Sequence, residues 1–288
     1  MKRWMRVVLA VAMLAGCNEY NRDAIEKNNQ GTRAFRERRL QDARDAFALA
    51  AQLDPKFDQP LYNLALVHFE QEHWAEAAEA LQGAIARDRR NPEYQFKLGY
   101  AHYQREQWEQ ARAAFQSATQ ISPSYWIAWY WLGKVAERLD EPQAALQAYT
   151  TAITKAPRAY RVYVNLGASY RSVNERDRAV AVLTEGLRVA PEGVAERADM
   201  LNIRGNTYLD MGRRDEALND LRQATREAPN LAAPFFSLGF TLSETPEHRS
   251  EAVLYLQRFL ELRDRDTPRE YVDVAQARLA ELQTAGSR

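Results

Sequence analysis

Small and large residues recur along most of this chain at a nearly constant spacing. A small residue stands at every 34th position, with one step of 38, and six of the twelve glycines take part: Gly31, Ala65, Gly99, Gly133, Gly167, Gly205 and Gly239. An alanine follows each of them twelve or thirteen residues later, and a large residue such as Phe47, Leu81 or Phe115 follows four residues after that alanine. Self-similarity at such a period is the signature of a repeat architecture.

The spacing predicts seven pairs of helices. Within each pair the small residue of the first helix allows the second helix to approach closely, and a proline at the end of most repeats stops the second helix. The predicted repeats cover residues 24–57, 58–91, 92–125, 126–159, 160–193, 198–231 and 232–266. Residues 194–197 are predicted to lengthen one connection. Residues 267–288 are predicted to form a final helix and a tail, with Tyr271, Val274, Leu279 and Leu282 as the apolar stripe.

The repeated pattern resembles the tetratricopeptide repeat (TPR), whose period is 34 residues. The fourth repeat shows the resemblance well, with Trp129, Leu132, Gly133, Ala145 and Tyr149 in register. The resemblance implies an all-α, right-handed α-solenoid of seven helix pairs, closed by a C-terminal capping helix. One helix pair cannot bury its apolar face alone, so stacking of neighbouring pairs forms the core.

The first sixteen residues have the parts of a secretory signal peptide: a basic start, a short apolar run and small residues at its end. Leu14-Ala15-Gly16-Cys17 resembles the lipobox of bacterial lipoproteins. This implies cleavage before Cys17, lipidation of that residue and a short tether at 17–23. Asn18 in place of Asp favours the outer membrane, facing the periplasm. The alternative is cleavage after a small residue such as Ala12, which would leave Cys17 as a free thiol.

Composition narrows the possible chemistry. Thirty-nine basic and thirty-nine acidic residues give no net charge, and nucleic-acid binding needs a basic surface. The single cysteine excludes a disulfide framework, and the four histidines leave little material for a metal site. His68 and His102 occupy a position that usually holds Tyr, where we expect helix packing. We find no phosphate loop and no nucleophile motif. The sequence therefore predicts a protein that is no enzyme and needs neither a cofactor nor a small-molecule substrate.

The family resemblance implies a partner-binding surface. In TPR proteins the first helix of each pair lines the concave surface, through the second, fifth, sixth, ninth and twelfth positions of the repeat. Carried over to this chain, these positions predict the following contact residues: Tyr62, Asn63, Phe96, Lys97, Tyr100, Tyr103, Tyr130, Trp131, Lys134, Asn165, Arg171 and Asn202. Aromatic rings with interspersed amides and cations are typical of protein-binding surfaces. Some of these rings could instead be core; we expect Tyr100 and Trp131 to be exposed.

The sequence thus predicts a lipid-anchored envelope scaffold that binds a protein or peptide through a concave TPR groove. The signal, the short tether and the regular repeats resemble type IV pilus pilotins, lipoproteins that help outer-membrane secretins to assemble. Two alternatives stay open. One is an adaptor that docks peptidoglycan hydrolases, and the other is a structural subunit of another envelope complex.

Overall fold

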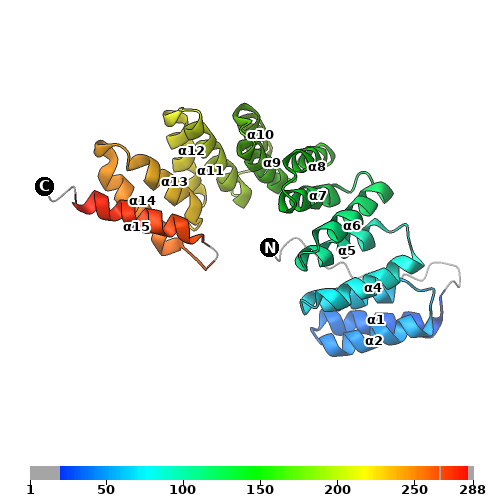
Figure 1. The fold of residues 1–288 in the computed structure, drawn as a ribbon. Helices are drawn as coiled ribbons and strands as arrows, with labels where there is room; N and C mark the ends of the chain where they lie inside the picture. Colours follow the sequence, from blue (N-terminus) through cyan, green and yellow to red (C-terminus); the bar gives the residue numbers. More distant parts are fainter. Residues whose placement is uncertain (1–19, 266, 285–288) are drawn as a thin grey trace. The chain divides into compact units, whose positions relative to one another are not determined.

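The computed structural model of the protein describes residues 20–265 and 267–284. Within these residues the chain folds into fifteen α-helices and one short 3-10 helix, with no β-strand (Figure 1). The all-α prediction is therefore confirmed. The chain forms two compact units that are divided between Glu141 and Pro142, so the fourth predicted repeat contributes one helix to each unit. None of the described helices combines the length and apolar character that crossing a bilayer requires.

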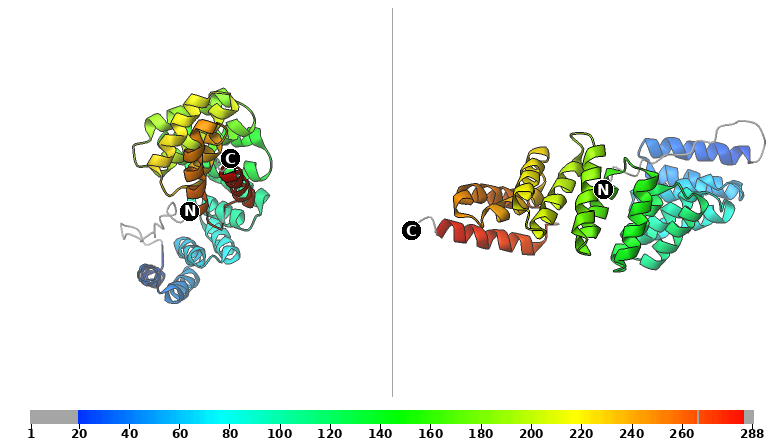
Figure 2. Two further views of the ribbon diagram at one scale, coloured as in Figure 1. Left: turned by 90° about the vertical axis from the view of Figure 1, so that its left-hand side faces the viewer. Right: turned by 90° about the horizontal axis from the view of Figure 1, so that it is seen from above.

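Consecutive helices contact one another within each unit (Figures 1 and 2). The N-terminal unit contains α1 (Arg22–Arg36), α2 (Leu40–Leu53), α3 (Gln59–Glu70), α4 (Trp74–Arg87), α5 (Pro92–Gln104), α6 (Trp108–Ile121) and α7 (Trp126–Arg138). The C-terminal unit contains α8 (Pro142–Lys155), α9 (Tyr160–Ser172), α10 (Arg176–Val189), α11 (Ala195–Asp210), α12 (Arg214–Glu227), α13 (Ala232–Leu242), η1 (Pro246–His248), α14 (Arg249–Leu262) and α15 (Arg269–Thr284).

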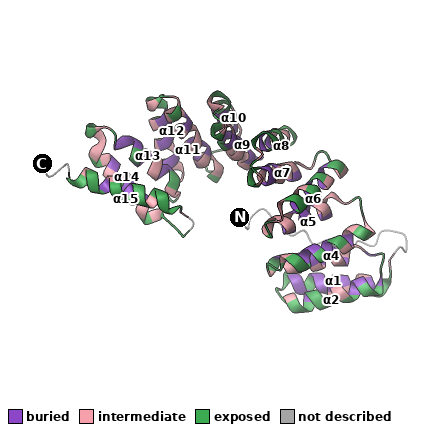
Figure 3. Ribbon diagram, viewed as in Figure 1, coloured by how far each residue is buried: buried purple, intermediate pink, exposed green. Residues whose placement is uncertain are grey.

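The small residues of the first helices lie directly against large residues of the second helices. A Cβ atom placed on Gly99 would lie 2.7 Å from the Phe115 ring, and one on Gly31 would lie 2.6 Å from Phe47. The same contact joins Gly167 to Leu183, Gly205 to Leu221 and Gly239 to Leu256. Phe47, Phe115 and Leu183 are completely buried. Buried residues accordingly follow the inner faces of the paired helices, and exposed residues the outer faces (Figure 3).

A recurring turn joins the two helices of a pair. Arg38, Glu72, Glu106, Asp140 and Asn174 have positive φ, between 56° and 65°, and Gly212 takes the equivalent place in the sixth repeat. The next residue donates its backbone N–H to a carbonyl five residues earlier, as His73 does to His68 at 2.9 Å. This is the Schellman closure, in which one left-handed residue ends a helix. The turn fixes where each second helix begins.

Three segments differ from the prediction. Residues 195–197 belong to α11, which has sixteen residues, so the insertion lengthens a first helix as well as the connection before it. Helix α1 begins at Arg22, two residues before the predicted first repeat. On α15, Ala275 and Leu279 are buried, whereas Tyr271 and Val274 are 47% and 37% exposed. Arg278 of the same helix donates to the Ser243 hydroxyl and carbonyl at 2.8 and 2.9 Å.

Replacement of Gly99 by leucine is expected to destabilise the N-terminal unit, because the new side chain overlaps the buried Phe115 ring. Overpacking of this kind typically costs about 1–3 kcal/mol. Chemical denaturation followed by circular dichroism measures the loss. Ala75→Leu, on the exposed side of α4, is the matched control and should leave the midpoint nearly unchanged. Equal effects of the two variants would contradict the close contact between α5 and α6.

Candidate functional site

Aromatic side chains from several helices of the N-terminal unit form one connected cluster, which we call the aromatic cluster: Phe69, Trp74, Tyr100, Tyr103, Trp108, Phe115, Tyr130 and Trp131. Trp131 of α7 lies at its centre. The centroid of its ring is 4.9 Å from those of both Tyr100 and Tyr103 on α5, and 5.8 Å from that of its neighbour Tyr130. Most of these ring pairs meet edge to face, the geometry that aromatic quadrupoles favour.

The cluster is only partly accessible. Tyr100, Tyr103, Tyr130 and Trp131 are half-buried, so each presents part of its ring to the surface. Trp131 also stacks on the buried Phe115 at 6.1 Å, which makes it a packing residue as well as a surface residue. The expectation that Tyr100 and Trp131 stand free on a surface therefore has to be corrected, because neighbouring rings cover much of both.

Four predicted contact residues are buried. Tyr62 and Phe96 are 4% exposed, Lys97 is 3% exposed and Asn63 is completely covered. Interior contacts account for three of them. The Tyr62 hydroxyl donates to Glu93 at 2.8 Å, the Asn63 amide donates to Asn28 at 2.8 Å, and the Phe96 ring lies 5.7 Å from that of Phe115. Tyr62 and Asn63 thus join neighbouring repeats and Phe96 packs within its own, so the assignment of these three side chains to an accessible contact surface is wrong.

Lys97 differs from its buried neighbours because its charge is not matched. Its amine lies 5.9 Å from the ring centroids of both Phe69 and Phe96. No hydrogen bond or ion pair joins it to another residue in the described part of the chain. Burial lowers the pKa of Lys97, and the charge of Glu93 one turn earlier opposes that shift only in part. A cation held between two rings without an anionic partner is costly to keep.

Lys134 provides the accessible charge beside the aromatic cluster. Its amine donates to Glu137 at 2.7 Å, and 29% of its side chain is exposed. Burial, the largest single influence, lowers the pKa of Lys134, but the hydrogen bond and the charge of Glu137 together with smaller charge effects outweigh it, so the pKa is raised. On the other side of the cluster, Arg138 donates to the Tyr103 hydroxyl at 3.3 Å and lies 5.7 Å from the Trp108 ring centroid. The surface around Trp131 therefore combines rings with both signs of charge.

The remaining predicted residues lie in the C-terminal unit. Asn165 on α9 is half-buried, and Arg171 on the same helix is exposed and pairs with Asp210 at 2.6 Å. Asn202 on α11 accepts a hydrogen bond from Asn206 through its backbone carbonyl at 2.9 Å, and Asn206 also donates to Ser237 at 3.0 Å. Arg171 and Asn202 are thus each bonded to another residue of the C-terminal unit.

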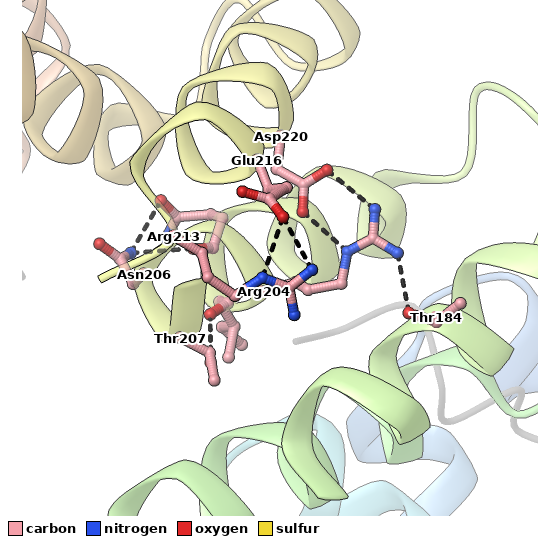
Figure 4. Close-up of polar contacts among 9 residues, drawn as sticks. Thr184, Arg204, Asn206, Thr207, Arg213, Glu216 and Asp220 are labelled. Carbon is pink, nitrogen blue, oxygen red and sulfur yellow. Dashed lines mark hydrogen bonds and ion pairs between the residues drawn. The ribbon is translucent and has the colours of Figure 1, made fainter. Parts of the chain in front are cut away.

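A largely buried ion pair that the sequence did not predict joins α11 to α12 (Figure 4). Arg204 of α11 donates two hydrogen bonds to Asp220 of α12, at 2.7 and 2.8 Å, and a third to Thr184 of α10 at 2.9 Å. Asp220 is 2% exposed. Nearby, burial raises the pKa of Asp199 to about 6. Asp199 stands at the second position of the sixth repeat, which is one of the lining positions, so the repeat register alone could have identified it as a candidate contact residue.

The histidines of α3 and α5 make local contacts. His68 lies 6.2 Å from His73 between ring centroids, and burial lowers its pKa, so His68 favours the neutral form. His102 makes a 2.7 Å hydrogen bond with Gln107. Among residues 20–265 and 267–284, no three His, Cys, Asp or Glu side chains are grouped so that they could hold a metal ion.

Comparison with known proteins identifies the family. Three family models described as tetratricopeptide repeat match residues 62–125 and 104–160, 162–195, and 198–231, which together make up more than half of the chain. The chain therefore belongs to the tetratricopeptide-repeat family, and its helix pairs form a TPR solenoid. Such repeats are typically non-catalytic scaffolds that mediate protein–protein interactions. No curated protein matches the chain.

Solved structures agree on the fold. A tetratricopeptide repeat protein from Parabacteroides merdae aligns with a TM-score of 0.62 and 14% identity, over 91% of this chain and 100% of that one. PilF of Pseudomonas aeruginosa gives 0.60 and 17%, over 77% and 98%. YrrB, described as a TPR protein with an unusual peptide-binding site, gives 0.56 and 21%, over 67% and 97%. At these identities the likeness is one of fold.

Replacement of Lys97 by methionine is expected to stabilise the protein by about 1 kcal/mol, because it removes the charge of a nearly covered side chain that has no hydrogen-bonded anionic partner. The pKa of Lys97 is lower in the folded than in the unfolded chain, so its penalty is present at neutral pH. That penalty disappears as the pH rises toward the unfolded value of 10.5.

This expectation is tested by comparing the denaturation midpoints of the Lys97→Met variant and the native chain. Both are measured at neutral pH and again near pH 10. The advantage of the variant should shrink at the higher pH. Lys134→Met is the control, since it removes an amine that has a carboxylate partner, and it should bring no gain. A destabilised Lys97→Met variant would show that the amine is well solvated or paired in solution.

Proposed function

We propose that this chain is a lipid-anchored scaffold of the bacterial cell envelope that holds a protein partner on the first helices of its N-terminal unit. The observation that carries the proposal is the aromatic cluster around Trp131, with the half-exposed rings of Tyr100, Tyr103 and Tyr130 beside Lys134. Half-exposed aromatics next to charged side chains are the usual anchors of protein interfaces. The TPR family to which the chain belongs supports binding of a protein or peptide.

The envelope location rests on the N-terminal sequence. Cys17 lies outside the described residues, and its lipidation is proposed from Leu14-Ala15-Gly16-Cys17 and the preceding apolar run. Several acyl chains on one residue give stable attachment, whereas a single chain is marginal. Asn18 supports the outer membrane as the site of attachment, with the repeats in the periplasm.

For the pathway, we propose assistance to outer-membrane secretin assembly in type IV pilus biogenesis. The support is the combination of a lipoprotein signal, a short tether and a run of regular repeats, which resembles the pilotins. Deletion of the gene should then deplete secretin multimers in outer-membrane fractions, while secretin monomers persist. Unchanged secretin multimers together with altered cell-wall crosslinking would instead support the adaptor for peptidoglycan hydrolases.

The partner-binding surface can be tested by truncating two of its accessible residues, Tyr130→Ala together with Lys134→Ala. Truncation of an anchor often costs 2 kcal/mol or more, which is roughly a 25-fold loss of affinity at about 1.4 kcal/mol per tenfold. The partner, identified by crosslinking in native membranes, is titrated against each variant. Glu76→Ala with Glu79→Ala, on the exposed side of α4, is the matched control and should bind like the native chain.

Tyr130 and Lys134 are better targets than Trp131 because Trp131 packs against four other rings, and its loss would disturb the fold. Circular dichroism of the double variant should match that of the native chain. Full affinity in the folded double variant would place the partner elsewhere on the molecule.

The anchor is tested by Cys17→Ser. Without the thiol, the precursor cannot be acylated, so the variant should appear in the soluble periplasmic fraction or accumulate as an uncleaved precursor. Fractionation and mass spectrometry of the native N-terminus measure this. A Cys17→Ser chain that is cleaved at the same place and still pellets with membranes would rule out the lipid as the anchor.

A further inference from the structure

The N-terminal end of the described chain is fixed to the turn between α2 and α3. The Tyr20 ring stacks on Phe57, with ring centroids 4.5 Å apart, and the Asn21 backbone N–H donates to the Asp54 carboxylate at 2.8 Å. Phe57 is 1% exposed and Asp54 is 8% exposed, so both partners belong to the packed body of the unit. The α2–α3 turn therefore determines where the chain leaves the fold toward its N-terminus.

The distance from this point to Cys17 is short. Three residue steps separate Cys17 from Tyr20, and a fully extended chain covers about 11 Å in three steps. A lipid on Cys17 would consequently hold the α2–α3 turn close to the bilayer. The ends of α1 and α2 at the other edge of the unit lie a helix length away, about 20 Å for fourteen residues.

The surface at this turn has the composition of a membrane-contacting patch. Leu49 and Leu53, one helical turn apart on α2, are 39% and 37% exposed. Lys56 follows in the turn and is exposed. Exposed leucines beside cations are what the headgroup region of an anionic bilayer binds.

The neighbouring turn, between α4 and α5, extends the patch. Arg87 at the end of α4 donates to the backbone carbonyls of Phe57 and Ala51, at 2.6 and 3.2 Å, and so ties the two turns together. Arg89 and Arg90 in the α4–α5 turn are exposed. Both turns thus present basic side chains at the same edge of the unit.

The carboxylates of these two turns accept hydrogen bonds from nearby backbone or hydroxyl groups. Asp54 accepts from the backbone of Asn21 and Lys56, Asp58 accepts from the Tyr94 hydroxyl, and Asp88 accepts from the backbone of Arg90. Asp54 is buried, Asp58 and Asp88 are partly exposed, and Asp23 in the first turn of α1 is exposed. The fully exposed charged side chains of the two turns, Lys56, Arg89 and Arg90, are therefore all basic, although the sequences of the turns are mixed.

We infer that this edge of the N-terminal unit, formed by Leu49, Leu53, Lys56, Arg89 and Arg90, lies against an anionic phospholipid surface. The inference rests on the proposed lipid anchor, since the lipid brings the edge to the bilayer. It sets an orientation: the inter-repeat turns of this unit face the membrane, and the turns within its pairs face away.

The test places a fluorophore at each edge of the full lipidated chain, reconstituted in vesicles that contain phosphatidylglycerol. Gln52→Cys labels the inferred membrane edge between the two leucines, and Arg36→Cys labels the opposite end of α1; both positions are exposed. The acylated Cys17 does not react, so each variant carries one label. Nitroxide-headgroup lipids should quench the label at 52 severalfold more than the label at 36.

A charge-reversed chain sharpens the result. Arg89→Glu with Arg90→Glu should lower quenching at position 52 in phosphatidylglycerol vesicles, with a much smaller effect in purely zwitterionic vesicles. Flotation of the vesicles tests the lipid anchor separately from the orientation. Chains that float but show equal quenching at both positions, or no response to charge reversal, overturn the orientation alone. Chains that do not float overturn the lipid anchor and the orientation together.

Discussion

The close approach of the two helices within a pair is the constraint on which the rest of this structure depends. A glycine in the first helix leaves room for a phenylalanine or leucine of the second, and a Cβ in its place would come within 3 Å of that side chain. Because interiors are packed at crystal-like density, the pair has one preferred separation. That separation determines how the next pair can stack, so the geometry of a single contact is repeated along each unit.

The interior produced by this stacking is more polar than the apolar ladder suggests. Asn28 and Asn63 are fully covered, and Asp220 pairs with Arg204 almost out of contact with water. Removing one partner of a buried pair generally costs much more than the intact pair contributes. Such groups discriminate among registers of otherwise similar helices, since a shifted helix would leave them unmatched. A solenoid of near-identical repeats has particular need of that discrimination.

The repeat ladder predicted the fold because the small and large positions act locally, within one helix pair. The site was harder to predict, because the lining positions of the repeat place a residue on the concave face of a helix but do not say which neighbouring side chains cover it. Tyr62 and Asn63 stand at lining positions, but the Tyr62 hydroxyl and the Asn63 amide nitrogen donate to Glu93 and Asn28 of neighbouring repeats. Trp131 was placed on the correct helix, while its four ring contacts depend on residues from α5, α6 and α7 at once. The Arg204–Asp220 pair joins residues sixteen positions apart on two helices, and no motif marks it.

The turn within each pair has a consequence for how this chain could be altered. Five of these turns place Arg, Glu, Asp or Asn in the left-handed conformation, at φ near 60°, where only the sixth repeat has glycine. A side chain in that conformation costs about 1–2 kcal/mol. Glycine would remove this cost, but part of the gain would be lost because glycine gives the unfolded chain more conformational entropy. This conformational cost recurs once in each of the first five repeats, at exposed positions between Arg38 and Asn174. Replacing these residues by glycine, one turn at a time, therefore gives laboratory evolution a route to higher thermal stability that leaves the core packing unchanged.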